Sequence, residues 1–215
     1  VNVREVPLAA DTYALDIEAM LRAVDEHTRL MWVCSPNNPT GNAFPLSELE
    51  QLATRFDGVL VVDEAYIDFS DKGSMLSVLS HHPNVVVLQT LSKAWGMAGL
   101  RLGLAFASPE VAALFAHVKY PYNVNGPTQR DVMQRLATEA HDEHVAEVIR
   151  ERQALSSALL SASCVMRVYP SDANFLLIKV RDADALYAHL VAKGIIVRNR
   201  HRVPGCKNCL RLTIG

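Results

Sequence analysis

Residues 59–66, Val-Leu-Val-Val-Asp-Glu-Ala-Tyr, join a short apolar run to a pair of acids and a phenol. Two similar junctions lie on either side of it in the chain. Residues 30–33 precede the loop Ser-Pro-Asn-Asn-Pro-Thr-Gly at 35–41, and residues 85–88 precede Thr-Leu-Ser-Lys at 90–93. Short runs rich in branched apolar residues are typical of buried strands in a parallel sheet. We therefore expect three such strands, each followed by polar groups of a different kind.

The segments around these strands add helices and one more strand. Apolar residues recur with a helical period over 15–24 and 46–56, and residues 102–107 have the pattern of a strand. Alternation of strands and helices favours an α/β fold, in which a mostly parallel sheet is flanked by helices.

The last third of the chain has a different pattern. Residues 127–161 are charged and alanine-rich, which predicts one long helix. Strand patterns at 165–169, 174–180, 195–197 and 210–214, with a helix at 184–193, then predict a small α+β unit. We accordingly expect residues 1–130 to be part of a large domain, 131–160 a connecting helix, and 161–215 a small C-terminal domain. Because both ends fall in strand-like segments, we expect a fragment of a longer polypeptide with both domains incomplete.

The composition is that of an ordinary globular protein. Of the 215 residues, 50% are hydrophobic and 20% charged. The net charge is −2, so no basic excess argues for a nucleic-acid partner. We identify no signal peptide and no apolar run of membrane-spanning length, and therefore expect a cytoplasmic protein without a membrane partner.

Cysteine and histidine spacings do not predict a metal centre. Cys206 and Cys209 form a single C-x-x-C pair, whereas a structural zinc site needs further ligands at suitable spacing. We expect these thiols, with Cys34 and Cys164, to be reduced and structural. His141 and His144 lie three residues apart on the predicted long helix, and we interpret them as solvated helix polarity.

The polar groups after the three strands match the needs of pyridoxal phosphate. Ligands of an open parallel sheet bind beyond the carboxyl ends of its strands, so these groups should converge. The cofactor needs an amine for its aldehyde, a carboxylate for its ring nitrogen, donors for its ring oxygen, and hydroxyls with an arginine for its phosphate. The candidates are, in that order, Lys93; Asp63; Asn38 and Tyr66; and Thr90, Ser92 and Arg101.

Taken singly, each of these residues has an ordinary explanation. A lysine after a strand is most often a surface charge, and an Asp-Glu pair is most often a cap or a solvated turn. Asn-Pro-Thr-Gly alone is a turn signal. The combination, in this order and at three strand ends, favours the cofactor site.

The motifs together resemble those of the fold-type I pyridoxal phosphate aminotransferases, over essentially the whole chain. They are Ser-Pro-Asn-Asn-Pro-Thr-Gly at 35–41, Val-Asp-Glu-Ala-Tyr-Ile-Asp-Phe at 62–69, Thr-Leu-Ser-Lys-Ala at 90–94 and Ala-Gly-Leu-Arg-Leu-Gly at 98–103. Three further motifs resemble the histidinol-phosphate aminotransferase branch: Asp-Ala-Asn-Phe at 172–175, Gly-Ile-Ile-Val-Arg at 194–198 and Cys-Leu-Arg-Leu-Thr-Ile-Gly at 209–215.

The resemblance implies roles for individual residues. Lys93 would form the Schiff base (aldimine) with the cofactor and act as the acid–base of a ping-pong cycle. Arg211 would grip the carboxylate of an amino acid, and Arg198 the phosphate of the substrate. Asn174 would face the substrate. The substrates implied are histidinol phosphate with glutamate and 2-oxoglutarate, and the partner implied is a second copy in a homodimer of the full-length protein.

Some parts of the family's site have no counterpart in these residues. The family holds the cofactor phosphate partly with a small-residue turn at a helix N-terminus, stacks an aromatic ring on the cofactor, and completes each site with a tyrosine of the partner subunit. We expect the 215 residues alone to be inactive or weakly active.

Two other functions stay open. One is a pyridoxal phosphate decarboxylase acting on a phosphorylated amino acid, because the substrate's orientation on the ring decides between the two reactions. The other is an aminotransferase-like ligand-sensing domain of a transcription regulator, which would need an attached DNA-binding segment.

Overall fold

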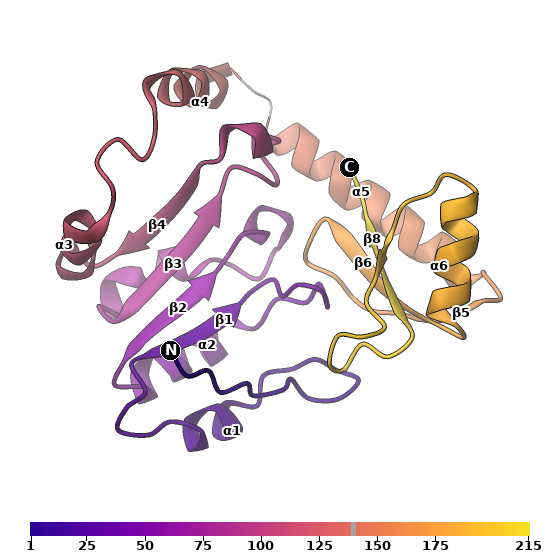
Figure 1. Ribbon diagram of the computed structural model, residues 1–215, viewed down its shortest axis with the longest axis horizontal. Helices are drawn as coiled ribbons and strands as arrows, with labels where there is room; N and C mark the ends of the chain where they lie inside the picture. The colour runs from indigo at the N-terminus through magenta and orange to yellow at the C-terminus, as the bar shows by residue number, and fades with distance from the viewer. Residues whose placement is uncertain (139–140) are drawn as a thin grey trace.

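The three apolar runs form the parallel strands of one sheet, as the sequence predicts. A computed structural model describes residues 1–138 and 141–215 of the chain (Figure 1). Sheet A contains β1 (Leu30–Cys34), β2 (Val59–Asp63), β3 (Val85–Thr90) and β4 (Gly103–Ala107), in that order across the sheet. The first three strands are parallel, and β4 runs antiparallel to β3 with Gly103 opposite Thr90. The α/β fold with a mostly parallel sheet is therefore confirmed.

Helix α2 (Leu46–Arg55) covers one face of sheet A. It buries Leu49, Leu52 and Ala53 against a core that includes Leu60 and Val62 of β2. Burial of each leucine contributes roughly 1.5–3 kcal/mol. The short helix α1 (Ile17–Arg22) begins at Asp16, whose side chain accepts a hydrogen bond from the Ala19 N–H (2.8 Å).

A second, antiparallel sheet follows in the last third of the chain. Sheet B has the order β5 (Val165–Val168), β6 (Phe175–Val180), β8 (Cys209–Thr213), β7 (Arg198–Asn199). Its central strand β6 is buried along almost its whole length because both faces are covered. Helices α5 (His141–Leu160) and α6 (Ala183–Ala192) contribute to one cluster, and Tyr13 and Tyr169 pack with Leu177 and both C-x-x-C cysteines in another.

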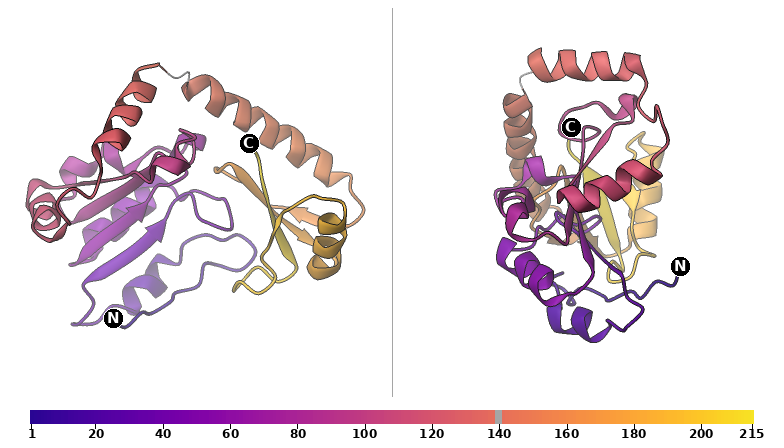
Figure 2. Two further views of the ribbon diagram at one scale, coloured as in Figure 1. Left: turned by 45° about the horizontal axis from the view of Figure 1, so that its top comes forward. Right: turned by 90° about the vertical axis from the view of Figure 1, so that its left-hand side faces the viewer.

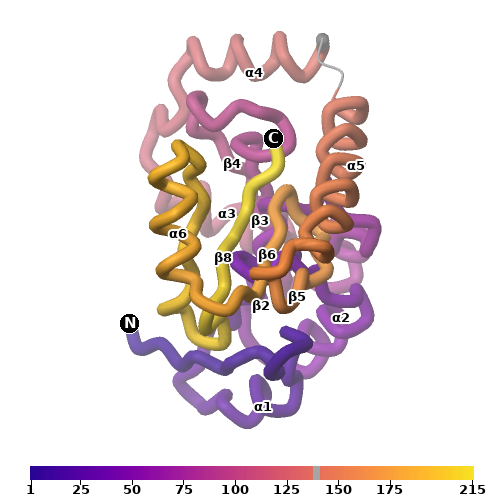
Figure 3. The backbone as a smooth tube through the Cα atoms, turned by 90° about the vertical axis from the view of Figure 1, so that its right-hand side faces the viewer, coloured from indigo at the N-terminus to yellow at the C-terminus, as the bar shows by residue number. Residues whose placement is uncertain are grey.

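Two expectations about elements are wrong. The long helix predicted over 127–161 is two helices, α4 (Gly126–Thr138) and α5, which run in different directions (Figure 3). Residues 139–140, inside the predicted helix, lie outside the described residues. The strand predicted at 195–197 begins at Arg198 instead, because the chain is still leaving α6: Gly194 has a φ of +78°, and the Ile195 N–H donates to the Leu190 carbonyl (2.9 Å).

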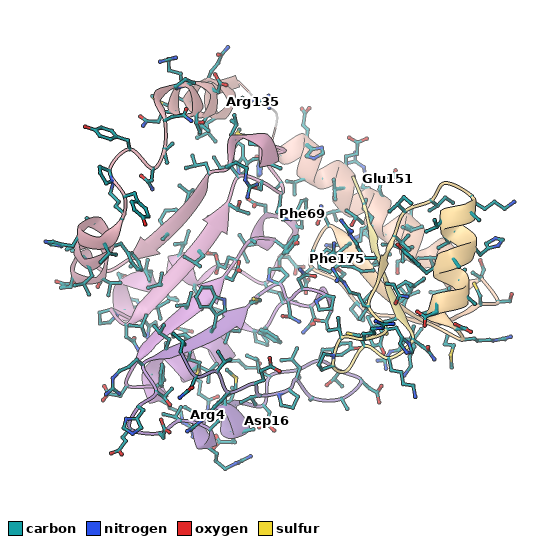
Figure 4. The ribbon with its side chains drawn as sticks, viewed as in Figure 1. Arg4, Asp16, Phe69, Arg135, Glu151 and Phe175 are labelled. Atoms are coloured by element: carbon teal, nitrogen blue, oxygen red, sulfur yellow. The ribbon has the colours of Figure 1, made fainter. Side chains whose placement is uncertain are left out.

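Helix α5 connects the two sheets. It packs against the 3-10 turn η1 (Ile67–Phe69), which follows β2, and against β5 and β6 of sheet B (Figure 2). Helix α3 (Pro109–Val118), which the sequence analysis did not identify, follows β4 and buries none of its side chains. Phe69 of η1 and Phe175 of β6 lie between the sheets, in the same buried cluster (Figure 4).

Candidate functional site

The carboxyl ends of β2 and β3 present their polar groups at one edge of sheet A. Asp63, the last residue of β2, is level with Leu88 of β3, and Thr90 is two residues further along β3. Since side chains alternate along a strand, Asp63 and Thr90 emerge on the same face of the sheet. Cys34 of β1 pairs with Asp63 on this face, and burial, with a smaller effect from the Asp63 charge, raises the pKa of its thiol to about 11.

The side chain of the neighbouring acid, Glu64, lies on the opposite face of sheet A. Its buried carboxylate accepts hydrogen bonds from the Ser74 hydroxyl (2.6 Å), the Met75 N–H (2.7 Å) and the Gln89 side-chain amide (2.9 Å). Burial raises the pKa of Glu64 despite these donors. Glu64 is therefore a structural link between β2, β3 and residues 74–75, whereas Asp63 is the acid available at the candidate site.

Lys93 lies in a tight turn after β3. The Ser92 N–H donates to the Thr90 hydroxyl (3.1 Å), and the Gly96 N–H to the Lys93 carbonyl (3.0 Å). Leu91 and Met97, on either side of Lys93 in the chain, are buried, whereas Lys93 itself is exposed. Its amine lies over the ring of Tyr66, 5.3 Å from the ring centroid.

Tyr66 and Arg211 connect this turn to sheet B. The buried ring of Tyr66 meets the Phe175 ring edge-on, with centroids 5.2 Å apart. The Arg211 guanidinium lies 4.8 Å from the Phe175 centroid, and its Nη1 donates to the Asn38 side-chain oxygen (2.7 Å). The structure thus brings together Asn38, Tyr66, Lys93 and Arg211, which come from four distant parts of the chain.

The loop that carries Asn38 is held by both sheets. The Ser35 N–H donates to the Asp63 carbonyl (2.9 Å), and the Asp172 N–H to the Gly41 carbonyl (2.7 Å). Gly41 has a φ of +87°, and a Cβ there would lie 2.6 Å from the Ser171 hydroxyl oxygen. The glycine of the Asn-Pro-Thr-Gly motif is therefore required by both conformation and space.

Arg101 lies at the same edge as Thr90. It follows the 3-10 turn η4 (Ala98–Leu100), has a φ of +55°, and is exposed, with Nη1 donating to the Ala98 carbonyl (2.9 Å). The Leu91 N–H donates to the Leu102 carbonyl (3.3 Å), which keeps the two segments adjacent. Asn174 contributes a backbone contact, its carbonyl accepting from the Ile214 N–H (2.8 Å), so its predicted contact with substrate stays a prediction.

Three arginines share one face of sheet B. Arg198 and Arg211 are directly opposite in the β7–β8 pair, and the Arg200 N–H donates to the Cys209 carbonyl (2.9 Å), two residues further along. In the described part of the chain none of the three forms an ion pair, and the Nε atoms of Arg200 and Arg211 are buried without an acceptor. Burial lowers the pKa of Arg211, Tyr66 raises it, and the Arg200 and Arg198 charges lower it again.

Arg200 was missed by the sequence analysis. The signal was available, because residues 198 and 200 are two apart in a strand-like segment and must face the same way. The signal is weak, because the pattern predicts a strand at 195–197, which does not include residues 198 and 200.

Histidines and cysteines do not form a metal site among the described residues. All four cysteines are free thiols, as expected, although Cys164 is exposed. The interpretation of His141 as solvated polarity is wrong: its side chain is 15% exposed, and its ring stacks on that of Trp95. His144, by contrast, is exposed. In the described ranges, none of the helices combines the length and apolar character needed to cross a bilayer.

Comparisons with known proteins identify the relatives of the whole chain. Residues 1–215 match the family model described as aminotransferase class I and II. A histidinol-phosphate aminotransferase from Parabacteroides distasonis is 50% identical over 216 aligned residues, covering 100% of this chain and 62% of that protein. The chain thus spans less than two thirds of the length of this curated relative.

Two solved structures share the fold. A histidinol-phosphate aminotransferase from Sinorhizobium meliloti, in complex with pyridoxal-5′-phosphate, has a TM-score of 0.88 and 26% identity, over 99% of this chain and 60% of that one. A decarboxylase from Sulfurospirillum multivorans has a TM-score of 0.81 and 29% identity, over 95% of this chain and 62% of that one.

Proposed function

The chain belongs to the aminotransferase class I and II family, and from that premise we propose that it transfers amino groups with the help of pyridoxal 5′-phosphate. The amino donor we propose is histidinol phosphate and the acceptor 2-oxoglutarate, with glutamate as product of a ping-pong cycle. The observation that carries the proposal is the meeting of the Lys93 amine, the Tyr66 ring, the Asn38 amide and Arg211. The 50% identical relative of that name supports the choice of substrate.

The residues present fit this cofactor. Its aldehyde needs an accessible amine, and the Lys93 side chain is exposed above the Tyr66 ring. Its ring nitrogen needs a carboxylate, and Asp63 emerges on the same face of sheet A as Thr90. Its phosphate needs several donors, and Thr90, Ser92 and Arg101 lie where β3 ends and β4 begins.

Each predicted residue then has a role in binding. Asp63 would keep the ring nitrogen protonated, and Asn38 and Tyr66 would donate to the ring oxygen. Thr90, Ser92 and Arg101 would hold the phosphate. When bound, pyridoxal phosphate supplies an electron sink for charge that develops at the substrate Cα.

Lys93 is the proposed general base. Its Nζ would take the proton from the substrate Cα and hold it until it is returned to the product. Its amine lies 5.3 Å from the Tyr66 ring centroid, within the distance of about 6 Å at which a cation is attracted to an aromatic ring. The buried leucine and methionine beneath the turn hold Lys93 at this place.

The arginines of sheet B would bind the anionic end of the substrate. Arg211 is fixed by Asn38 and Phe175, and its buried Nε has no acceptor among the described residues. Arg198 and Arg200 add two charges on the same face without a carboxylate counter-ion among the described residues. A phosphate carries more negative charge than a carboxylate, so three arginines favour a phosphorylated substrate.

A decarboxylase is the second candidate. The Sulfurospirillum multivorans decarboxylase shares the fold at 29% identity. The residues proposed here for pyridoxal phosphate would also serve a decarboxylase that uses this cofactor. The two reactions differ in which bond at Cα breaks, and hence in the product.

The proposal also covers the oligomeric state and the cellular location of the full-length protein. A homodimer of the full-length protein is proposed, because residues of the family's site are supplied by the partner subunit. A cytoplasmic location stays a prediction, in keeping with a role in histidine biosynthesis.

The test is an assay of both products. The full-length protein is used, because we expect the 215 residues alone to be inactive or weakly active. It is incubated with pyridoxal phosphate, histidinol phosphate and 2-oxoglutarate, and glutamate formation is measured. In a second reaction a phosphorylated amino acid replaces histidinol phosphate, and carbon dioxide release is measured. Glutamate that requires both substrates, and that disappears in Lys93→Ala but not in Lys119→Ala, is the expected result. Carbon dioxide release from a phosphorylated amino acid, independent of 2-oxoglutarate, would replace the proposal with the decarboxylase.

A further inference from the structure

A cluster of three side chains includes residues that follow Lys93 and Tyr66 closely in the chain. The rings of Trp95 and His141 are stacked, with centroids 3.9 Å apart and planes at 21°. His141 Nε2 lies 3.5 Å from the Asp68 carboxylate, and the two side chains are 15% and 26% exposed. This group, here the Trp95–His141–Asp68 cluster, joins three elements that are distant in the sequence.

Two members of the cluster belong to the turns that carry site residues. Trp95 is two residues after Lys93, in the turn closed by the bond from the Gly96 N–H to the Lys93 carbonyl. Asp68 is two residues after Tyr66, in the turn closed by the bond from the Phe69 N–H to the Tyr66 carbonyl (3.1 Å). Because both turns are tight, the position of each cluster side chain constrains the site residue beside it.

We propose that His141 is a positioning residue for Lys93: by contacting Trp95 and Asp68 at once, it holds the Lys93 turn against the Tyr66 turn. The positioning rests on contacts within the chain, and only its consequence for catalysis rests on the proposed function. Since α5 also packs against β5 and β6, the same contact links the lysine to the sheet that carries Arg211.

The charge of His141 should set the strength of this link. An imidazolium ion is attracted both to the Asp68 carboxylate and to the face of the Trp95 indole, whereas neutral imidazole keeps the stacking alone. Acidification through the range in which an imidazole becomes charged should therefore tighten the contact. Burial raises the pKa of Asp68 and His141 lowers it, as expected for an acid whose main counter-charge is this histidine.

Other charged groups near the cluster are few among the described residues. The buried Glu64 is one of them, because the Asp68 charge contributes, after burial, to the raised pKa of Glu64. On the helix of His141, Asp142 lies 3.1 Å from His141 Nδ1 and is fully exposed. Further along α5, Arg152 donates to the carbonyls of Phe69 (3.2 Å) and Ala173 (2.7 Å), with the charges of Asp71 and Asp172 nearby. Asp68 is therefore the less exposed of the two carboxylates that contact the imidazole.

The first experiment measures the contact between His141 and Trp95 and needs no cofactor. Trp32→Phe leaves Trp95 as the single tryptophan, and its fluorescence is measured from pH 8.5 to pH 5. An imidazolium quenches a stacked indole, so emission should fall on acidification. It should stay flat when His141→Gln is added, and still fall when the exposed His144→Gln is added instead. His141→Phe, which keeps a stacked ring without a charge, should also give a flat profile.

The second experiment reads the position of Lys93. Pyridoxal phosphate is added to the chain and reduced onto lysines with borohydride, and the label on each peptide is quantified by mass spectrometry. His141→Gln should slow labelling of Lys93 by about two- to fivefold, the factor expected for one lost cation–π contact. Labelling of Lys119 and Lys193 should be unchanged, and His144→Gln should match the parent chain.

The outcomes separate this inference from the proposed function. A flat fluorescence profile in the Trp32→Phe chain, or equal Lys93 labelling in His141→Gln and His144→Gln, would overturn the positioning role. A pH-dependent profile with His141-dependent labelling supports it even where no amino transfer is detected. Should His141→Gln fail to fold, Asp68→Asn replaces it, because that change removes the counter-charge at nearly constant volume.

Discussion

At the scale of single residues, the two adjacent acids at the end of β2 have different roles: Glu64 is structural, and Asp63 is proposed to hold the cofactor. Asp63 and Glu64 are adjacent in the chain but emerge on opposite faces of sheet A. The sequence predicts Asp63 as the acid beside the polar strand ends, because a motif fixes the order of residues, and its role at the site stays a prediction. It could not predict the three hydrogen bonds of Glu64, because their donors are 10 to 25 residues away in the sequence.

Glu64 should make the stability of the chain depend on pH. Its carboxyl has a pKa raised above the ordinary 4.5, so the folded state binds the proton more tightly than the unfolded state. The free energy of unfolding should therefore fall as pH rises from about 4.5 through the raised pKa. Glu64→Gln should flatten this slope in urea unfolding measured at several pH values. An unchanged slope in Glu64→Gln would show that another group is responsible.

At the scale of elements, the local pattern predicted the parallel strands well and the edges of sheet B poorly. The runs of β1, β2 and β3 are apolar on both faces, so their sequence alone identifies them. β7 has two residues, and its position depends on how the chain leaves α6 and on its pairing with β8. The stacking of His141 on Trp95 depends on the placement of α5, which residue spacing along one helix does not reveal.

The β7–β8 pair yields a test of the arginine face. Arg200→Gln removes one of three charges from it, and should raise KM for histidinol phosphate by about tenfold, the effect of one lost charge-assisted hydrogen bond. Arg202→Gln, an exposed arginine in the turn that follows, is the matched control and should have no such effect. Equal KM values for the two variants would remove Arg200 from the site.

Helix α5 yields a test of the link between the sheets. Arg152 donates to two carbonyls, one in η1 and one just before β6, from a half-buried position. Arg152→Met keeps most of the apolar stem but leaves both carbonyls without this donor, and should lower the free energy of unfolding by about 1–3 kcal/mol. Arg150→Met, on the exposed side of the helix, should change it by less than about 0.5 kcal/mol. The free energy of unfolding of both variants is measured in urea. Similar decreases in Arg152→Met and Arg150→Met would argue against the link.

At the scale of the whole molecule, apolar side chains remain uncovered on two elements. Trp32 on β1 is 56% exposed, and Leu114 and Val118 on α3 are 66% and 80% exposed. The two elements belong to opposite edges of sheet A, because β1 is the first strand of the sheet and α3 follows β4, the last. Large exposed apolar surface in a protein usually marks a contact with another polypeptide. The chain also spans about 62% of the length of its 50% identical relative.

This surface should be detectable with a hydrophobic dye. The chain should enhance the fluorescence of anilinonaphthalene sulfonate, and the double change Leu114→Ser with Val118→Ser should reduce the enhancement. The unfolding midpoint of the double variant should stay nearly the same as that of the parent chain, because α3 buries no side chain. An enhancement that does not change would place the dye elsewhere on the molecule.

The whole fold also explains why the site could be predicted in part. Asn38, Tyr66, Lys93 and Arg211 were identified from motifs, and the parallel order of β1, β2 and β3 brings the first three to one edge. Arg211 reaches them because α5 and the Gly41 loop place sheet B beside that edge. Contacts of that kind, between sheets, are set by tertiary packing and not by local pattern.

The central claim is that Lys93 is the amine that receives the cofactor beside Asp63. Its most direct test is a titration of the chain with pyridoxal phosphate, followed by visible absorption. We predict a long-wavelength band in the parent chain and in Lys119→Ala, a weaker and more pH-sensitive band in Asp63→Asn, and no band in Lys93→Ala. A Lys93→Ala spectrum identical to that of the parent chain would contradict the account.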